Sequence, residues 1–438
     1  MKNSLFFIMV VSTLFGGVLE YYGSGERMLS YDPSSIGLGD AYHFGGNLTD
    51  VLDNSPSTLW RSPLTRINLI TNYSFSKSSF TKQNFSVNHF SFSFPFSSKK
   101  VISFGLNPHT RSDYSLKEND GYFIAQNEND FNANPMQVIT NYRSYGGISN
   151  GYGALSFSIN NYFSFGIKYI QMFGTQISDK IILQNEFDAY TNEIVDQDST
   201  QQIIINEYKG NSIQFDSRIS YGKSEAVFSA TFSNEMKVKS SLYYDVYSYP
   251  DIYDRYFLND FSFVFVESGD QLMQTNSDYE FNQSNQSVKF LDRLRDYSFG
   301  YQYLIKSYSG IIFEYHKDNN YNNLNSFNYI NQLNIGNYPI LESYHLGYFY
   351  RFEDIKGRLL SSLIFRTGFY YRYLNFDNQI NQDIGIALGV GLGLMDVHTV
   401  NLAFKIGKIN TDVMGLGNEN YFKFTLGLNL GEKWFIKK

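Results

Sequence analysis

The chain has 438 residues, with 35 basic and 42 acidic side chains and a formal net charge of −7. That balance excludes a nucleic-acid binder that works through a basic surface, and the absence of cysteine excludes disulfide scaffolds, thiolate metal sites, cysteine nucleophiles and lipoprotein anchoring. The 37 tyrosines and 40 phenylalanines exceed what a soluble core needs. This aromatic content is typical of a β-barrel wall that faces lipid.

Residues 1–19 are predicted to form a secretory signal peptide for Sec export. Lys2 precedes an apolar run from Leu5 to Phe15, which is too short to span a bilayer as a helix. Cleavage next to Gly16 and cleavage after Gly25 remain alternatives. No later segment carries the roughly 18 continuous apolar residues that a membrane-spanning helix needs.

Residues 20–66 do not alternate and are rich in glycine and proline. They nevertheless contain apolar side chains, among them Leu48, Val51, Leu52, Leu59 and Trp60. Such a segment is too apolar for a free tail and poorly suited to a spanning strand. We therefore expect it to fold into the barrel mouth as a plug, or hatch.

Residues 67–438 are predicted to form an all-β, transmembrane antiparallel β-barrel of about 14 strands. Each predicted strand alternates apolar or aromatic residues with small or polar ones, because one face meets lipid and the other the lumen. The last strand is the clearest, since Phe422, Phe424, Leu426 and Leu428 share one face. The predicted strands cover residues 67–76, 84–94, 100–107, 152–160, 162–171, 211–221, 224–234, 296–305, 308–317, 342–352, 358–373, 383–394, 398–408 and 420–430.

The connections between these strands alternate in length. Those after even-numbered strands have about one to five residues, whereas those after strands three, five, seven and nine have about 24 to 61. Outer-membrane barrels place short turns in the periplasm and long loops outside. An even strand count then returns the C-terminus to the periplasm, where Trp434 and Phe435 are expected to join the aromatic girdle. A secreted β-sandwich or β-helix is the alternative fold.

Strand alternation also predicts which charged side chains face the lumen. The inward cations are Lys168, Arg218, Arg366, Arg372, Lys405 and Lys423, and the inward counter-groups are Asp216, Glu314 and His345. They favour an acidic solute, or acidic partners on an internal plug, while a structural ladder of salt bridges is the other interpretation. One face of residues 383–394 consists of Gly385, Ala387, Gly389, Gly391 and Gly393. This face leaves room for a plug or a ligand.

Two stretches of the N-terminal segment resemble a known family. Residues 35–41, Ser-Ile-Gly-Leu-Gly-Asp-Ala, and residues 53–64, Asp-Asn-Ser-Pro-Ser-Thr-Leu-Trp-Arg-Ser-Pro-Leu, look like the hatch of the long-chain fatty-acid transporter family, FadL. Pro63 stands at the proline of that family's Asn-Pro-Ala element, although both neighbours differ. The resemblance implies a fourteen-stranded barrel with an N-terminal hatch, through which hydrophobic solutes pass from outside to an internal site. A divergent branch, similar to PorV, instead serves the type IX secretion machinery as a partner.

The expected function is therefore outer-membrane transport of hydrophobic small molecules such as long-chain fatty acids. The alternative is a PorV-like partner or shuttle of type IX secretion, or a structural barrel. Expected partners are outer-membrane lipid, lipopolysaccharide and a hydrophobic solute, with no nucleic acid and no cofactor. The candidate ligand-binding or gating residues are Leu48, Leu59, Trp60, Pro63, Arg366 and Arg372.

An enzyme is not expected. Residues 147–151 fit the Gly-x-Ser-x-Gly pattern of a hydrolase elbow, but a strand is predicted to follow them where the elbow requires a helix. The six histidines show no metal-binding spacing, so no metal site is expected.

Overall fold

The structure is a computed structural model that is almost entirely β. It contains two short helices, α1 (Pro33–Ile36) and η2 (Pro56–Arg61). Among the described residues, no helix is long and apolar enough to cross a membrane. The residues described are 26–28, 30–46, 51–77, 81–124, 135–187, 191, 194–233, 236–249, 255–257, 263–265, 281–288, 294–318, 340–352, 360–376, 379–394, 397–410 and 418–432.

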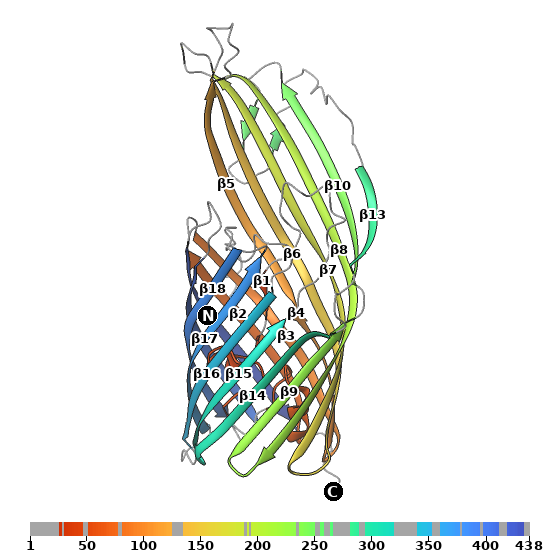
Figure 1. The fold of residues 1–438 in the computed structure, drawn as a ribbon, viewed down its shortest axis with the longest axis vertical. Helices are drawn as coiled ribbons and strands as arrows, with labels where there is room; N and C mark the ends of the chain where they lie inside the picture. Colours follow the sequence, from red (N-terminus) through yellow and green to blue (C-terminus); the bar gives the residue numbers. More distant parts are fainter. Residues whose placement is uncertain are drawn as a thin grey trace, which may run out of the picture.

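Fourteen antiparallel strands form a closed barrel (Figure 1). Each pairs with its neighbours in the ring, and β2 pairs with β20 to close it. All fourteen predicted strands coincide with strands of this ring, so the predicted fold class is confirmed. The ring consists of β2 (Thr65–Lys77), β3 (Thr81–Ser97), β4 (Lys100–Pro108), β6 (Pro135–Ser158), β7 (Phe163–Phe187), β8 (Ile194–Tyr221), β9 (Ser224–Ser233), β14 (Leu294–Lys306), β15 (Ser309–Asp318), β16 (Ile340–Phe352), β17 (Leu360–Phe376), β18 (Gln379–Leu394), β19 (His398–Asn410) and β20 (Glu419–Glu432).

The outer face of the ring is an apolar band. On β7, Phe163, Ile167, Tyr169 and Phe173 are all exposed, whereas the residues between them are buried or half-buried. Phe163 and Phe173 lie ten positions apart, which is about 34 Å along a strand. A strand tilt of about 40° reduces this to roughly 26 Å, the height of the apolar band of outer-membrane barrels. Trp434 and Phe435, predicted to extend this girdle, lie outside the described residues.

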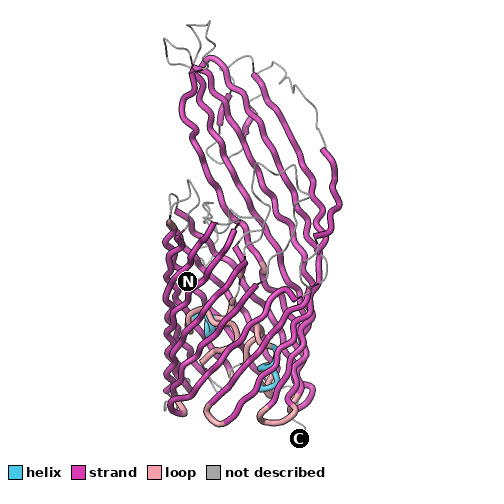
Figure 2. Tube along the Cα trace, in the orientation of Figure 1, coloured by secondary structure: helices cyan, strands magenta, loops and turns pink. Residues whose placement is uncertain are grey.

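Three wall strands continue far beyond the apolar band and form an extension above the barrel (Figures 1 and 2). The continuing strands are β6, β7 and β8, and strands β5 (Thr110–Ile124) and β10 (Met236–Tyr249) pair with their upper parts. The two-residue strand β1 (Glu26–Arg27) pairs with β5, and β13 (Phe281–Val288) pairs with β10. A separate two-stranded sheet is formed by β11 (Arg255–Phe257) and β12 (Phe263–Phe265). The described parts of the segments predicted as long loops after the third, fifth and seventh strands are thus largely strands.

The switch from barrel to extension occurs at glycines. Residues 149–157 of β6, its lower part, pair with β4. Residues 135–146, its upper part, pair with β5. At this switch Gly146 and Gly147 have φ angles of 101° and 139°, a region that L side chains rarely adopt. The glycine-rich residues 147–151 therefore serve this change of partner, and they lie within a strand.

Candidate functional site

The candidate site is the contact between the inner wall and the N-terminal segment, defined here as residues 26–64. Helix α1 packs against β18, β19 and β20, while η2 packs against β4, β6, β7 and β8. Both helices lie within the outline of the barrel in Figure 2. The segment thus meets strands from widely separated parts of the chain.

Wall glycines let the segment approach the backbone of the barrel closely. A Cβ atom added to Gly368 would lie 2.2 Å from the backbone nitrogen of Gly39, and one on Gly166 would lie 2.4 Å from the backbone carbon of Pro56. Gly389 on β18 meets Gly37 in the same way, since a Cβ on Gly37 would lie 2.7 Å from the Gly389 Cα. Part of the side-chain-free face predicted for β18 therefore contacts the N-terminal segment.

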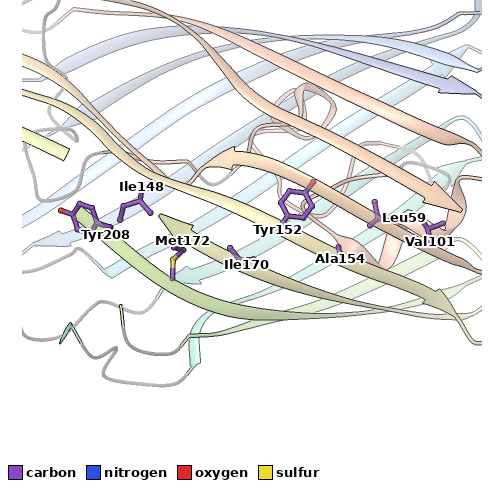
Figure 3. Close-up of a cluster of buried hydrophobic side chains, with 8 residues drawn as sticks. All are labelled: Leu59, Val101, Ile148, Tyr152, Ala154, Ile170, Met172 and Tyr208. Carbon is purple, nitrogen blue, oxygen red and sulfur yellow. The ribbon is translucent and has the colours of Figure 1, made fainter. Parts of the chain in front are cut away.

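Apolar side chains of the segment are buried against the wall in two clusters. Leu38, Ala41 and Phe44 pack with Val227, Ile312 and Phe349. Leu59 joins a second cluster, which Figure 3 shows following the wall strands away from η2. The members of this second cluster are Leu59, Val101, Ile148, Tyr152, Ala154, Ile170, Met172 and Tyr208.

Asp40 makes the first charged anchor of the segment. Its carboxylate lies 2.6 Å from Lys405 Nζ on β19 and also pairs with Arg372 on β17. Arg372 in turn lies 3.4 Å from Asp383 on β18. The Lys405 ammonium also sits over the Tyr370 ring, 4.3 Å from its centre. All of these side chains are buried, so the charges are shielded from water and depend on one another.

Asp53 makes the second anchor, against strands β2 and β3. Its carboxylate accepts hydrogen bonds from Asn68 Nδ2 at 2.9 Å and Ser91 Oγ at 2.6 Å, and lies 2.9 Å from His89 Nε2. Burial alone would raise the pKa of Asp53, but these hydrogen bonds and the neighbouring histidine hold it well below its usual value. Lys168 Nζ donates to the backbone carbonyl of the same residue at 3.2 Å. Asp53 therefore binds the wall as a carboxylate.

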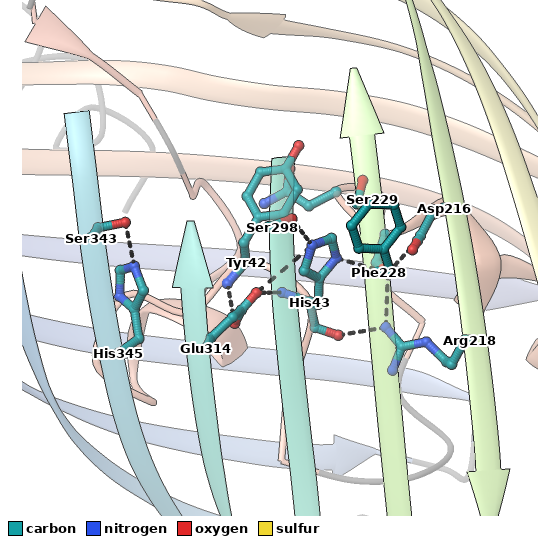
Figure 4. A network of polar contacts seen from close by, with 12 residues as sticks. Tyr42, His43, Asp216, Arg218, Phe228, Ser229, Ser298, Glu314, Ser343 and His345 are labelled. Atoms are coloured by element: carbon teal, nitrogen blue, oxygen red, sulfur yellow. Dashed lines mark hydrogen bonds and ion pairs between the residues drawn. The ribbon is translucent and has the colours of Figure 1, made fainter. Parts of the chain in front are cut away.

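Arg218 on β8 makes the third anchor (Figure 4). Its Nη2 donates to the backbone carbonyl of His43 and to Ser55 Oγ, both at 2.8 Å, and its Nη1 pairs with Glu225. Asp216 accepts from the Oγ atoms of Ser55 at 2.5 Å and Ser57 at 2.8 Å. A single inward-facing patch of β8 thus holds both halves of the segment.

His43 and Glu314 complete this network without adding a cation. The Glu314 carboxylate accepts the backbone N–H groups of Tyr42 at 2.8 Å and His43 at 2.9 Å. Burial and the charge of Arg218 hold the pKa of His43 well below its usual value, so its ring is neutral. The ring nitrogens lie 2.6 Å from Ser298 Oγ and 3.2 Å from Ser55 Oγ.

The predicted site residues fall in different places. Leu59 is buried, Trp60 is half-buried with its backbone N–H donating to Ser156 Oγ at 3.1 Å, and Pro63 is exposed. Arg366 and Arg372 are both buried and face the segment, Arg366 Nε donating to the backbone carbonyl of Gly45 at 2.5 Å. Leu48 lies outside the described residues. Their roles in ligand binding or gating stay predictions.

The structure identifies further residues that neither the strand alternation nor the motifs had singled out. Asp40, His43 and Asp53 provide the anchors of the segment, and Glu225 pairs with both Arg218 and Arg61. Asp40 and Asp53 stand inside the stretches that resemble a hatch, and their charge among glycines and serines was the available signal. Alternation did predict their inward cationic partners on the wall.

In the part of the chain that the structure describes, no group of three or more His, Asp or Glu side chains could hold a metal ion. The buried histidines and carboxylates described above are instead used in contacts between the segment and the wall.

A family model described as BamG matches residues 67–438. The chain belongs to the BamG family. No curated protein matches the sequence at a significant level. The matched region therefore contains the ring of strands from residue 67 of β2 onward, while the N-terminal segment lies before it.

Solved structures resemble this member of the BamG family in fold. The CymD monoaromatic hydrocarbon channel matches with a TM-score of 0.52 and 10% identity, over 92% of this chain and 98% of the channel. The toluene transporter TbuX of Ralstonia pickettii gives 0.50 and 8%, also over 92% and 98%. A TodX monoaromatic hydrocarbon channel mutant gives 0.50 and 10%, over 96% and 100%. At such identities the likeness shows the fold alone. The fold is FadL-like, as predicted, and is that of an outer-membrane β-barrel.

Proposed function

We propose that this protein is an outer-membrane barrel with a closed lumen, which docks a protein partner on its extension. The observation that carries the proposal is the way the N-terminal segment is bound. The Asp40 and Asp53 carboxylates and several backbone carbonyls of the segment are held by buried wall side chains, among them Lys405, Arg218 and Arg366. The segment acts in this proposal as a hatch that stays in place.

The energy of these anchors opposes an easily opened hatch. Removing one partner from a buried ion pair costs about 3–5 kcal/mol, because a charge is left without compensation away from water. To undock the part of the segment around Asp40, Lys405 and Arg372 must both lose this carboxylate. Undocking the part around Asp53 breaks at least three further contacts. A solute path that required both openings would be strongly disfavoured.

The extension supplies the docking surface of this proposal. Its strands continue for many residues past Phe173, where the exposed apolar band of β7 ends, so they stand outside the bilayer. The extension is not needed to close the barrel, because the ring of strands is already closed below it. The match to the BamG family also hints at an outer-membrane assembly context. Because the long connections are expected outside, the docked partner would be reached at the cell surface.

The test removes the two central strands of the extension, the upper parts of β7 and β8, while keeping the ring. Residues 175–207 are replaced by a two-residue turn that joins Gly174 to Tyr208, which are paired in the sheet. The expected result is loss of a defined complex when native membranes are solubilised gently and run on a native gel. Replacement of residues 319–339 by a short turn is the matched control. Both variants must keep heat-modifiable gel mobility, the sign of a folded barrel, and a complex that survives loss of these two central strands would refute docking on the extension.

Transport of hydrophobic molecules, including long-chain fatty acids, is the second candidate. It is favoured by the fold shared with hydrocarbon channels and by the apolar cluster that leads from Leu59 along the inner wall (Figure 3). In this proposal Leu59 and Trp60 gate the path and Arg366 and Arg372 bind the solute carboxylate. Leu59→Ala with Trp60→Ala should then change uptake of a labelled long-chain carboxylate at matched surface expression. Unchanged uptake, together with an extension-dependent complex, would reject transport.

A further inference from the structure

A pocket of about 170 Å³ lies between the N-terminal segment and the wall. On one side it is lined by residues of the segment, among them Asp32 and Pro33 at the start of α1 and Leu52 before η2. On the other side it is lined by residues of β2, β17, β18, β19 and β20. A water molecule takes about 30 Å³ of liquid, so the pocket has room for about five waters or one small polar group. It shares Asn68 with the Asp53 anchor and is otherwise separate from the three anchors described above.

The wall of this pocket is built from two neighbouring rows of residues that cross five strands. The paired positions of one row are Ser362, Gly393, Thr399, Asn429 and Asn68. The next row consists of Ile364, Gly391, Asn401, Gly427 and Ile70. Glycines recur in both rows, and they leave the space into which larger side chains would project. Because Ser362 and Gly393 stand close to the ends of β17 and β18, the pocket lies at the short-turn end of the barrel.

Two guanidinium groups make the pocket attractive to an anion. Arg66 and Arg366 both line it. Arg366 is positioned by Gly45 O at 2.5 Å and by Asn401 Oδ1 at 3.3 Å, and a Cβ on Gly391 would lie only 2.5 Å from its Nη1. The guanidinium therefore lies directly over the glycine floor. Guanidinium groups bind phosphate and carboxylate oxygens with paired, charge-assisted hydrogen bonds.

The pocket also offers acceptors, and these narrow the class of anion. Asp32 lines it beside the arginines, with its Oδ1 accepting from the Ser34 N–H at 2.8 Å. The Oδ1 atom of Asn429 is buried and has no hydrogen-bond partner among the described residues. A carboxylate or a sulfate would bring only acceptors to these groups at neutral pH. A phosphate or phosphomonoester that keeps one proton brings acceptor oxygens for the arginines and one P–OH donor for Asp32 or Asn429.

We propose that this pocket is a binding site for a monohydrogen phosphate group, either free phosphate or the headgroup of a phosphomonoester lipid. Arg66 and Arg366 neutralise its charge, and Asp32 and Asn429 accept its proton-bearing oxygen. These acceptors let the site distinguish phosphate from sulfate, since sulfate would place bare oxygens against a carboxylate. The site is separate from the docking function proposed above and does not depend on it.

The experiment uses the full chain purified in detergent and titrated calorimetrically with inorganic phosphate. We expect binding of phosphate that is at least roughly tenfold tighter than binding of sulfate at equal ionic strength. This comparison needs no mutation, so it holds even if a variant folds poorly. Equal affinity for the two anions, or no phosphate binding together with no binding of a short-chain phosphatidic acid, would overturn the proposal.

Variants then locate the site. Arg66→Gln and Arg366→Gln should each weaken phosphate binding roughly tenfold or more, and Asp32→Asn should reduce the preference for phosphate over sulfate. Lys423→Gln, at an inward cation that does not line the pocket, is the matched control and should leave affinity unchanged. Binding of phosphatidic acid without inorganic phosphate would identify the lipid headgroup as the source, and binding of both would identify the phosphate group itself. Phosphate binding that neither arginine variant weakens would place it elsewhere and overturn the assignment.

Discussion

Neutralising Asp40 should release the N-terminal segment from the wall. Asp40→Asn keeps the size of the side chain and removes the charge that faces Lys405 Nζ at 2.6 Å and Arg372. Loss of one member of a buried ion pair costs about 3–5 kcal/mol. Because Arg372 still lies 3.4 Å from Asp383, we expect a value near the lower limit. At about 1.4 kcal/mol for each factor of ten, 3 kcal/mol makes undocking roughly a hundredfold more frequent.

The absence of cysteine from the chain gives a direct assay of undocking. Ser35 on α1 is fully buried, and its Oγ has no hydrogen-bond partner among the described residues, so Ser35→Cys introduces a single shielded thiol with little loss. Maleimide labelling of this thiol in outer-membrane vesicles should be roughly a hundredfold faster with Asp40→Asn. Asp113→Asn is the control, because its pairing with Arg111 at 3.8 Å is partly exposed and contributes about 1 kcal/mol at most. Equal labelling rates for Asp40→Asn and its parent would refute the anchoring role of Asp40.

Three further predictions follow from the seat of the segment and the closure of the ring. Gly368→Ala should speed labelling of the same thiol, because its Cβ would meet the segment backbone at 2.2 Å, whereas at Gly151 the nearest atoms are 3.5 Å away and alanine should have no effect. The lowered pKa of Asp53 means that its contribution is present above the ordinary aspartate pKa, about 3.9, and lost as the pH falls through the lower folded value. Trp60 fluorescence should therefore change only below about pH 4, and an unchanged acid profile in Asp53→Asn would contradict this. Deleting residues 420–438 removes β20 and opens the ring between β2 and β19, so heat-modifiable mobility should be lost.

The barrel could be predicted from the sequence because lipid imposes a strict rule on each spanning strand. Every second residue of a spanning strand must be apolar over about ten positions, and that pattern survives without knowledge of any partner strand. Phe163, Phe165, Ile167 and Tyr169 show it on β7, and the same residues are exposed or half-buried in the structure. The inward cations followed from the same alternation, and five of the six are buried in the lumen.

The extension could not be predicted by that rule, because its strands stand outside the apolar band. Beyond Phe173, residues 177–180 of β7 are all half-buried, so the two faces of the strand do not differ in exposure there. Polar residues there pair across strands, as Ser112 Oγ does with Ser144 Oγ at 2.8 Å. A sheet stabilised by such contacts has the amino-acid composition of a polar loop. Its strands become recognisable only through their partners.

The anchors of the N-terminal segment were hidden for a different reason. Asp40 and Lys405 are separated by 365 positions, and Asp53 and Ser91 by 38. Alternation fixes which way a wall side chain points, but it does not fix the height at which an irregular segment will meet it. The charges on both sides were therefore visible in the sequence, whereas their pairing depended on the path of the segment through the lumen.

The N-terminal segment and the extension are parts of one mechanical unit, because the same strands contact the segment and build the extension. Strands β6, β7 and β8 leave the membrane to form the extension, and within the barrel they hold η2 together with β4. β8 carries Asp216 and Arg218, β7 carries Lys168 and β6 carries Ser156, each of which binds the segment. A segment held this firmly stiffens the wall from which the extension rises, since buried ion pairs and close backbone contacts leave the strands little freedom to shift. A stiff wall below the extension is what the proposed docking function requires.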